Sequence, residues 1–109
     1  MKGKIVLVHF PFTDLSAVKL RPALVLYESD DDVIVAFISS RIPSSLLDSD
    51  LPVMADSDEF PATGLKVSSV IKFDKIATLS KVLVEGEIGE ISPVLAARCN
   101  DIMDSIFHF

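Results

Sequence analysis

An arginine precedes a proline at the point where a polar segment gives way to an apolar run. Arg21 comes directly before Pro22, and residues 22–27 have the length and composition of a buried strand. Proline fixes its own φ angle and disfavours helix at the residue before it. We therefore expect Arg21 to stand where the chain enters a sheet. A guanidinium group held there can bind a phosphate through two parallel hydrogen bonds, although an exposed arginine beside a turn is the simpler interpretation.

Hydroxyl groups appear at the end of another apolar run. Residues 33–38 predict a strongly apolar strand, and Ser39, Ser40 and Arg41 follow it directly. In isolation, these residues are typical of a strand end with turn-forming serines. No histidine or lysine stands close enough in the sequence to activate either serine as a nucleophile.

A histidine also lies near the end of a predicted strand. His9 belongs to residues 4–10, an apolar and β-branched segment that predicts the first strand of the fold. Imidazole exchanges protons near neutral pH, which suits general acid–base catalysis. A purely structural role for a lone histidine in a strand is the alternative.

The sequence lacks the motifs of most metal and cofactor enzymes. It has no glycine-rich phosphate loop, no paired-cysteine motif and no metalloprotease or hydrolase signature. Two histidines and one cysteine make a zinc site implausible, and Cys99 is expected to pack in the core. Residues 30–32 are three successive aspartates, which cannot all point one way on a strand and instead predict a solvated turn. We expect no metal and no cofactor.

The composition predicts one domain, residues 1–109, with a local basic surface. Half of the residues are apolar and the formal net charge is −6. Residues 1–22 and residues 64–82 each hold four basic residues against one acid, a net charge of +3. Because salt screens charges beyond about 8 Å, such segments can bind a polyanion despite the acidic total. No apolar run is long enough for a membrane helix or a signal peptide, so a cytoplasmic protein is expected.

Hydrophobic periodicity predicts a mainly β fold with one C-terminal helix. Ser92 as N-cap and Pro93 at the first helical position open that helix. Its apolar stripe consists of Leu95, Cys99, Ile102, Met103 and Ile106. Short strands separated by turns, followed by a helix, predict a small barrel or half-barrel plugged by the helix. The expected strands are residues 4–10, 22–27, 33–38, 51–54, 65–71, 75–79 and 82–88.

Four segments together resemble the MazF/PemK family of toxins. They read GKIVLVHFPFTD at residues 3–14, RPALVL at 21–26, IVAFISS at 34–40 and SVIKFDKIATL at 69–79. Their order and spacing match the family across nearly the whole chain. The Arg-Pro pair before an apolar strand is the strongest element of the resemblance.

The resemblance implies an SH3-like barrel that forms homodimers and acts as a toxin restrained by a cognate antitoxin. The implied activity is metal-independent, sequence-selective cleavage of single-stranded mRNA by an endoribonuclease that leaves a 2′,3′-cyclic phosphate. Arg21 matches the family's catalytic arginine, and Ser39 takes the place of its usual threonine. Lys19, Ser40 and Arg41 are the expected RNA-binding residues, with His9 as a possible acid or base. Residues 13–19 depart from the family pattern because they lack glycine.

Two other functions remain compatible with the same residues. A catalytically inactive or CcdB-like member of the fold would act by binding a protein target or its antitoxin. A small β-barrel interaction module without any toxin activity is the other. The acidic total charge and the serine at position 39 lend weight to the inactive or target-binding toxin, whereas the ordered resemblance argues against the interaction module.

Overall fold

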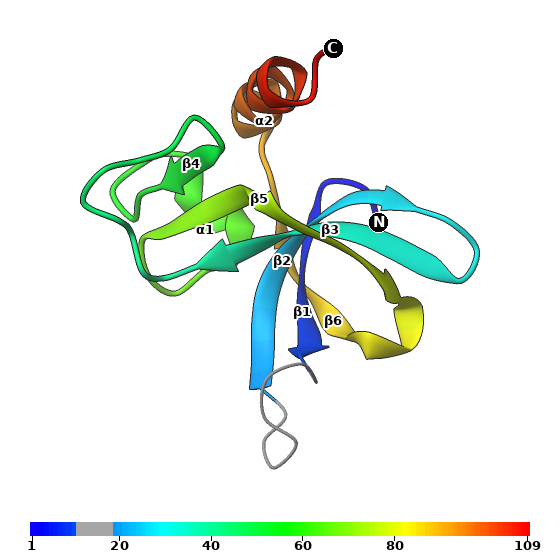
Figure 1. Cartoon of the computed structure of the whole chain (residues 1–109). Coiled ribbons are helices and arrows are strands. Elements are labelled where there is room, and N and C mark those ends of the chain that lie inside the picture. The colour runs from blue at the N-terminus through cyan, green and yellow to red at the C-terminus, as the bar shows by residue number, and fades with distance from the viewer. Residues whose placement is uncertain (11–18) are drawn as a thin grey trace.

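The strands of the chain form one antiparallel sheet in the computed structural model, which describes residues 1–10 and 19–109 (Figure 1). Within these residues the sheet has six strands in the order β4-β5-β3-β2-β1-β6. The strands are β1 (Lys4–Phe10), β2 (Lys19–Glu28), β3 (Asp32–Ser39), β4 (Asp50–Val53), β5 (Ser69–Ser80) and β6 (Val84–Glu90). Apart from residue 19, the glycine-free segment of residues 13–19 lies outside the described residues.

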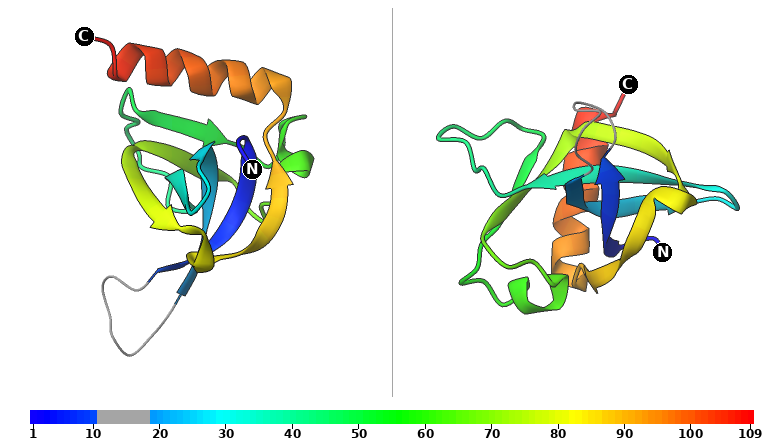
Figure 2. Two further views of the ribbon diagram at one scale, coloured as in Figure 1. Left: turned by 90° about the vertical axis from the view of Figure 1, so that its right-hand side faces the viewer. Right: turned by 90° about the horizontal axis from the view of Figure 1, so that it is seen from below.

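The predicted mainly β fold with a C-terminal helix is confirmed. In the described part of the chain, β4 and β6 are the two end strands of the order, so the sheet is not closed. Of the two predicted arrangements, the strands therefore form the half-barrel. The sheet curves strongly, and the C-terminal helix α2 (Pro93–Ile106) lies across one end of it (Figure 2). None of the helices in the described residues is long and apolar enough to cross a membrane.

β2 and β3 form an antiparallel hairpin around the turn predicted at residues 30–32. Ala23 pairs with Phe37 near one end of the two strands, and Glu28 pairs with Val33 near the other. The backbone N–H of Ser29 donates to the carbonyl of Asp32 at 3.0 Å and closes the turn. The aspartates of this turn are exposed, as the solvated turn predicted from the sequence requires.

The prediction of two separate strands at residues 65–71 and 75–79 was wrong. A single strand, β5, runs from Ser69 to Ser80 and contains a bulge of three residues. Consecutive residues Ala36 and Phe37 of β3 pair with Ile76 and Lys72 of β5, so residues 73–75 are left out of this ladder. Because the bulge breaks the period-two alternation, the sequence suggested a strand end there.

Two further short elements were absent from the prediction. α1 (Phe60–Thr63) is a four-residue helix, too short to show a helical period. A 3₁₀ turn, η1 (Lys81–Leu83), takes the first residues of the strand predicted at 82–88, and β6 starts at Val84. The edge strand predicted at residues 51–54 is confirmed as β4 with a shift of one residue.

The helix α2 begins and packs as its sequence pattern predicts. The Ser92 hydroxyl accepts a hydrogen bond from the backbone N–H of Leu95 at 3.1 Å. Leu95 and Cys99 are buried, and the rest of the stripe is half-buried against the same core cluster. That cluster fills one face of the sheet with residues such as Ile5, Leu24, Ile71 and Phe73. A second cluster lies on the other face and includes Val6, Val8, Ala23, Val25, Val33 and Val35.

Candidate functional site

The two predicted catalytic residues lie at the same end of the β2–β3 pair. Ala23 and Phe37 form the last register pair of these strands at that end. Arg21 precedes Ala23 by two residues and Ser39 follows Phe37 by two residues. Since side chains alternate along a strand, Arg21 and Ser39 lie on the same face of the sheet as Ala23 and Phe37. The structure therefore brings Arg21 and Ser39 to one end and one face of the sheet.

Arg21 is held by β1 and projects an exposed side chain. Its backbone pairs with Val8, which is fully buried, and Pro22 pairs with Leu7. Proline cannot donate to a ladder on its other side, and the pairing of β2 with β3 indeed ends before Pro22. No carboxylate among the described residues forms an ion pair with Arg21. As far as the described residues are concerned, its guanidinium donors are therefore free to bind an incoming anion.

Ser39 shapes the end of β3 with its side chain. Its Oγ accepts a hydrogen bond from the backbone N–H of Arg41 at 3.1 Å. The hydroxyl oxygen is used as an acceptor, which leaves the O–H to donate to another oxygen. Ser39 is half-buried and pairs with Val70 of β5, whereas Ser40 and Arg41 are exposed just beyond the strand.

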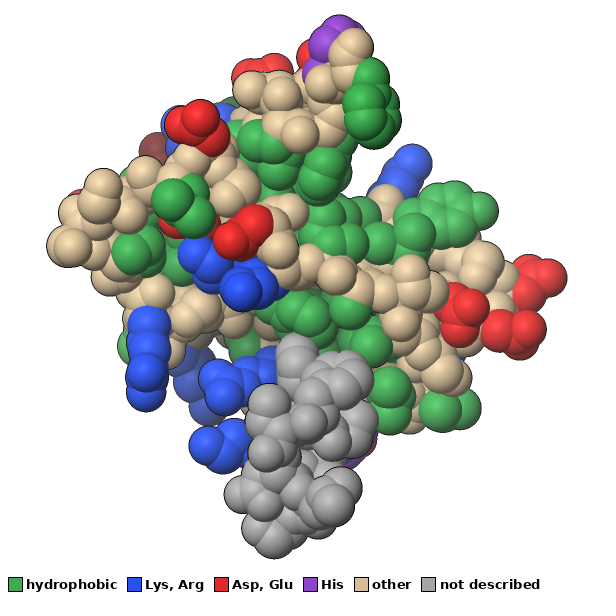
Figure 3. All heavy atoms as spheres, viewed as in Figure 1, with side chains coloured by type: hydrophobic (Ala, Val, Ile, Leu, Met, Phe, Trp, Pro, Cys, Tyr) green, Lys and Arg blue, Asp and Glu red, His purple; other side chains and the backbone are tan. Residues whose placement is uncertain are grey.

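Four basic residues surround this end of the sheet, and we refer to them as the basic face: Lys19, Arg21, Arg41 and Lys72. Lys19 lies two residues before Arg21 on β2, and Lys72 pairs with Phe37 from β5. Alternation therefore puts both lysines on the side of the sheet that carries Arg21. Figure 3 shows lysine and arginine side chains gathered where β2 begins and β3 ends, with acidic groups at the far hairpin tip. The arrangement gives an acidic protein a local surface for a polyanion.

Lys72 forms a buried ion pair that sequence reasoning missed. Its Nζ lies 2.7 Å from Oδ1 of Asp50, whose side chain is completely buried. The second carboxylate oxygen accepts the backbone N–H of Leu47 at 2.9 Å. Burial raises the pKa of Asp50, but the Lys72 hydrogen bond, the Leu47 amide and the lysine charge outweigh it and hold that pKa below its usual range. The lysine within the apolar run of residues 69–73 could have indicated this ion pair, because a charged side chain that is buried needs a partner of opposite charge.

His9 does not join the other predicted residues. Val8 and Arg21 form a register pair, so His9, the next residue of β1, faces the opposite side of the sheet. Its Nε2 lies 2.7 Å from Oε2 of Glu85 on β6, and this contact links the two strands. The structure therefore separates His9 from the face that carries Arg21 and Ser39.

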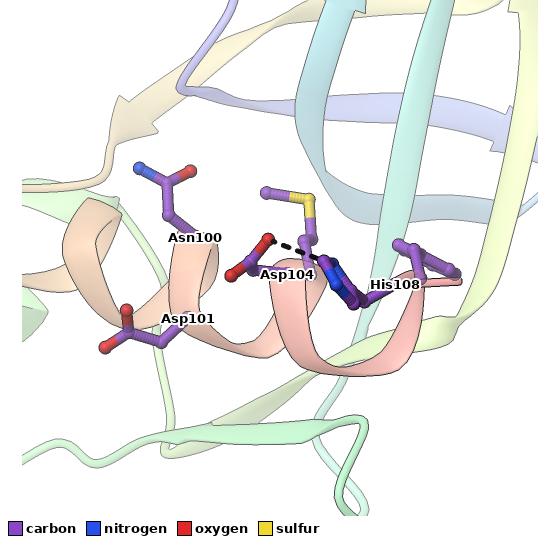
Figure 4. Close-up of a pocket in the computed structure, with 6 residues that line it drawn as sticks. Asn100, Asp101, Asp104 and His108 are labelled. Carbon is purple, nitrogen blue, oxygen red and sulfur yellow. Dashed lines mark ion pairs between the residues drawn. The ribbon is translucent and has the colours of Figure 1, made fainter.

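A shallow depression on α2 contains none of the predicted site residues. Asn100, Asp101, Met103, Asp104, Phe107 and His108 line it (Figure 4). Nδ1 of His108 lies 4.0 Å from Oδ1 of Asp104, and both side chains are largely exposed. In residues 1–10 and 19–109, no three side chains of His, Cys, Asp or Glu lie together in a way that could hold a metal ion.

The comparisons with known proteins identify the family. The model of a family described as PemK-like, MazF-like toxins of type II toxin–antitoxin systems matches residues 1–107. The chain belongs to this family. No curated protein sequence matches the toxin significantly.

Solved structures share the fold of the toxin. The Mycobacterium tuberculosis toxin MazF-mt6 has a TM-score of 0.74 at 21% identity, over 95% of this chain and 95% of that one. An endoribonuclease in complex with its cognate antitoxin, from a mycobacterial species, has a TM-score of 0.72 at 17% identity, over 98% and 93%. A mycobacterial endoribonuclease has a TM-score of 0.68 at 17% identity, over 96% and 88%. These structures confirm the fold, and the match over residues 1–107 confirms the family predicted from the sequence segments.

Proposed function

We propose that this toxin is a sequence-selective endoribonuclease that cuts single-stranded mRNA at its basic face. The observation that carries the proposal is the position of Arg21 and Ser39 on one face and at one end of the sheet, among further basic residues. Membership of the toxin family supports it, as does the likeness to proteins described as endoribonucleases.

The proposed chemistry uses the RNA as its own nucleophile. The 2′-hydroxyl loses its proton and attacks the adjacent phosphorus, and the bond from phosphorus to the 5′-oxygen of the next nucleotide breaks as that oxygen takes up a proton. The products carry a 2′,3′-cyclic phosphate and a 5′-hydroxyl. The guanidinium of Arg21 neutralises the charge that develops on the phosphate oxygens, an effect worth about 10²–10³ in rate for one well-placed donor. The O–H of Ser39 donates to a phosphate oxygen and keeps the attack in line.

Binding in this proposal comes from the backbone of the RNA. Lys19, Ser40 and Arg41 are all exposed around Arg21 and Ser39, where they can contact neighbouring phosphates. Sequence selectivity then requires unstacked, single-stranded bases, since protein side chains read these more readily than paired RNA. His9 is not needed as an acid or base, because it lies on the other face of the sheet.

The proposal includes two protein partners and a location. A cognate antitoxin restrains the toxin, which agrees with the antitoxin complex of a structural neighbour. A homodimer is favoured because β6 ends the strand order in the described residues, and sheet edges readily pair with another chain. The substrate, mRNA, and the absence of membrane-spanning helices in the described residues are compatible with a cytoplasmic location.

An RNA-cleavage assay in EDTA tests the function. Purified toxin is incubated with a long single-stranded RNA, and the ends of the fragments are analysed chemically. We expect discrete cuts with 2′,3′-cyclic phosphate ends, made by the wild type and by the control Arg98→Ala on the exposed side of α2. Intact RNA at high protein concentration would contradict the proposal and favour an inactive or target-binding toxin. Cleavage that EDTA abolishes would contradict the metal-independent mechanism.

A further inference from the structure

The buried ion pair between Lys72 and Asp50 lies beside the basic face. Lys72 pairs with Phe37 of β3 on one side and with Asp50 of β4 on the other. Val70, two residues earlier on β5, pairs with Ser39. Lys72 and Ser39 are therefore diagonal neighbours on one face, a relation that puts their Cβ atoms roughly 7–8 Å apart or closer.

Asp50 fixes both Lys72 and the loop of residues 40–49. One carboxylate oxygen accepts from Lys72 Nζ, and the other accepts from the Leu47 amide. The Asp50 amide in turn donates to the Leu47 carbonyl at 3.0 Å, and the Phe73 amide donates to the Ser49 carbonyl at 2.9 Å. The C-terminal end of this loop is thus bonded to β5 at two neighbouring residues, Lys72 and Phe73.

Stability alone is a poor reason for this arrangement. Desolvating two charges costs free energy, and well-packed apolar residues in place of a buried ion pair are often neutral or stabilising. Leu51 and Val53 already anchor β4 in the core. The bulge of residues 73–75 starts directly after Lys72, and bulges commonly re-aim a side chain next to a functional site.

The ammonium group of Lys72 has donors left for a ligand. An ammonium has three N–H donors, and Asp50 takes one of them. The Lys72 side chain is 20% exposed, whereas that of Asp50 is 0% exposed. The Lys72 side chain is therefore open to solvent, whereas the Asp50 carboxylate is not.

We propose that Lys72 binds an RNA phosphate next to the one held by Ser39, and that Asp50 is the positioning residue that aims the ammonium group at it. This inference rests on the proposed nuclease function and adds a contact to it. Asp50 itself touches no RNA. It acts through Lys72 and through the loop that carries Arg41.

The salt dependence of RNA binding tests the contact. The slope of log affinity against log salt is negative, and loss of one phosphate contact on single-stranded RNA reduces its magnitude by about 0.7, which is about fivefold in affinity at 0.1 M relative to 1 M salt. We expect this change in Lys72→Gln and wild-type behaviour in Lys72→Arg, with KM affected far more than kcat. Lys4→Gln breaks an exposed pair with Glu90 at the opposite end of β1 and should leave the slope unchanged.

Two further variants separate positioning from folding. Asp50→Asn keeps the lysine charge but no longer holds the ammonium group in place, so we expect an unchanged salt slope with a raised KM and weaker preference among cleavage sites. The double variant Asp50→Asn/Lys72→Gln leaves no unpaired buried charge, so we expect it to fold even where a single variant is unstable and to show the salt slope of reduced magnitude. Urea denaturation of each variant reports its stability independently.

Distinct outcomes would overturn the inference and the proposed function. A wild-type salt slope and KM in folded Lys72→Gln or in the double variant, with only stability lowered, would show that the pair is structural and would leave the nuclease intact. Wild-type KM and site preference in folded Asp50→Asn would overturn the positioning role. Wild-type protein that neither binds nor cuts RNA would overturn the proposed function and this inference together.

Discussion

Gly89 of β6 is a position where a single added methyl group should be highly disruptive. A Cβ atom built at Gly89 would lie 2.3 Å from both the carbonyl carbon and the carbonyl oxygen of Thr63 and 2.4 Å from the carbonyl oxygen of Ala62. Ordinary contact needs at least 3.4 Å, so α1 would have to move by about 1 Å. The atoms involved are backbone, and Thr63 is fully buried with its hydroxyl bonded to the Phe60 carbonyl. The helix end therefore cannot yield as a flexible side chain would.

The cost of Gly89→Ala follows from this close approach. Overpacking of this kind costs about 1–3 kcal/mol, and the rigid contact puts Gly89 at the upper end, about 2–3 kcal/mol. For a domain of this size that corresponds to a drop in Tm of roughly 10–20 °C. Gly86 on the same strand has no atom within 4 Å of its Cβ position. Gly86→Ala should be neutral or stabilise by up to about 1 kcal/mol, because it reduces the entropy of the unfolded chain.

Urea denaturation of the two alanine variants beside the wild type measures this difference. With a slope of about 2 kcal/mol/M, Gly89→Ala should lower the midpoint by about 1 M, and Gly86→Ala should leave it in place. Equal midpoints for the two variants would refute the packing of α1 on β6. Neither position lies on the basic face, so RNA cleavage by folded Gly89→Ala at low temperature should match the wild type.

The remaining predictions concern the hydroxyl at the site and the acid stability of the fold. Ser39→Ala should lower kcat by about 10²–10³ because the O–H that donates to the phosphate is lost, whereas Ser39→Thr should keep kcat near the wild-type value. A wild-type kcat for Ser39→Ala would exclude Ser39 as a donor to the phosphate. The pKa of Glu28 is lowered to about 2 by hydrogen bonds from Lys81 and the Met1 amino group, and that of Asp50 is also lowered. Both carboxylates have a lower pKa in the folded state, so both contribute stability that is lost in acid; for Glu28 this contribution is present above about pH 4.5 and is lost as the pH falls towards 2. Urea midpoints should therefore fall over that window, and less steeply for Glu28→Gln; an unchanged pH dependence in this variant would contradict the assignment.

Local signals in the sequence predicted the parts of the fold that depend on local contacts. The N-cap, the first-turn proline and the apolar stripe of α2 all lie within 15 residues, and the helix starts where they indicate. The bulge in β5 could not be predicted in the same way. The position of the bulge is set by the pairing of β5 with β3 and by the hydrogen bond from the Phe73 amide to Ser49. Both partners are distant in the sequence.

The candidate site shows the same division. Arg21 could be found because the proline after it constrains the backbone at that position. The face of His9 depends on the register of β1 against β2, which no local pattern reveals. The partner of Lys72 lies 22 residues away on a strand whose pairing was not predictable. The residue types that do chemistry were thus visible in the sequence, but the way they combine needed the sheet.

The rate of RNA cleavage by Arg21→Ala in EDTA tests the central claim most directly. Wild type, Arg21→Ala and the control Arg98→Ala are compared on one single-stranded RNA under single-turnover conditions, after denaturation curves have shown that all three are folded. We predict a rate about 10²–10³ lower for Arg21→Ala and an unchanged rate for Arg98→Ala. Equal rates for all three proteins would contradict the assignment of cleavage to the basic face.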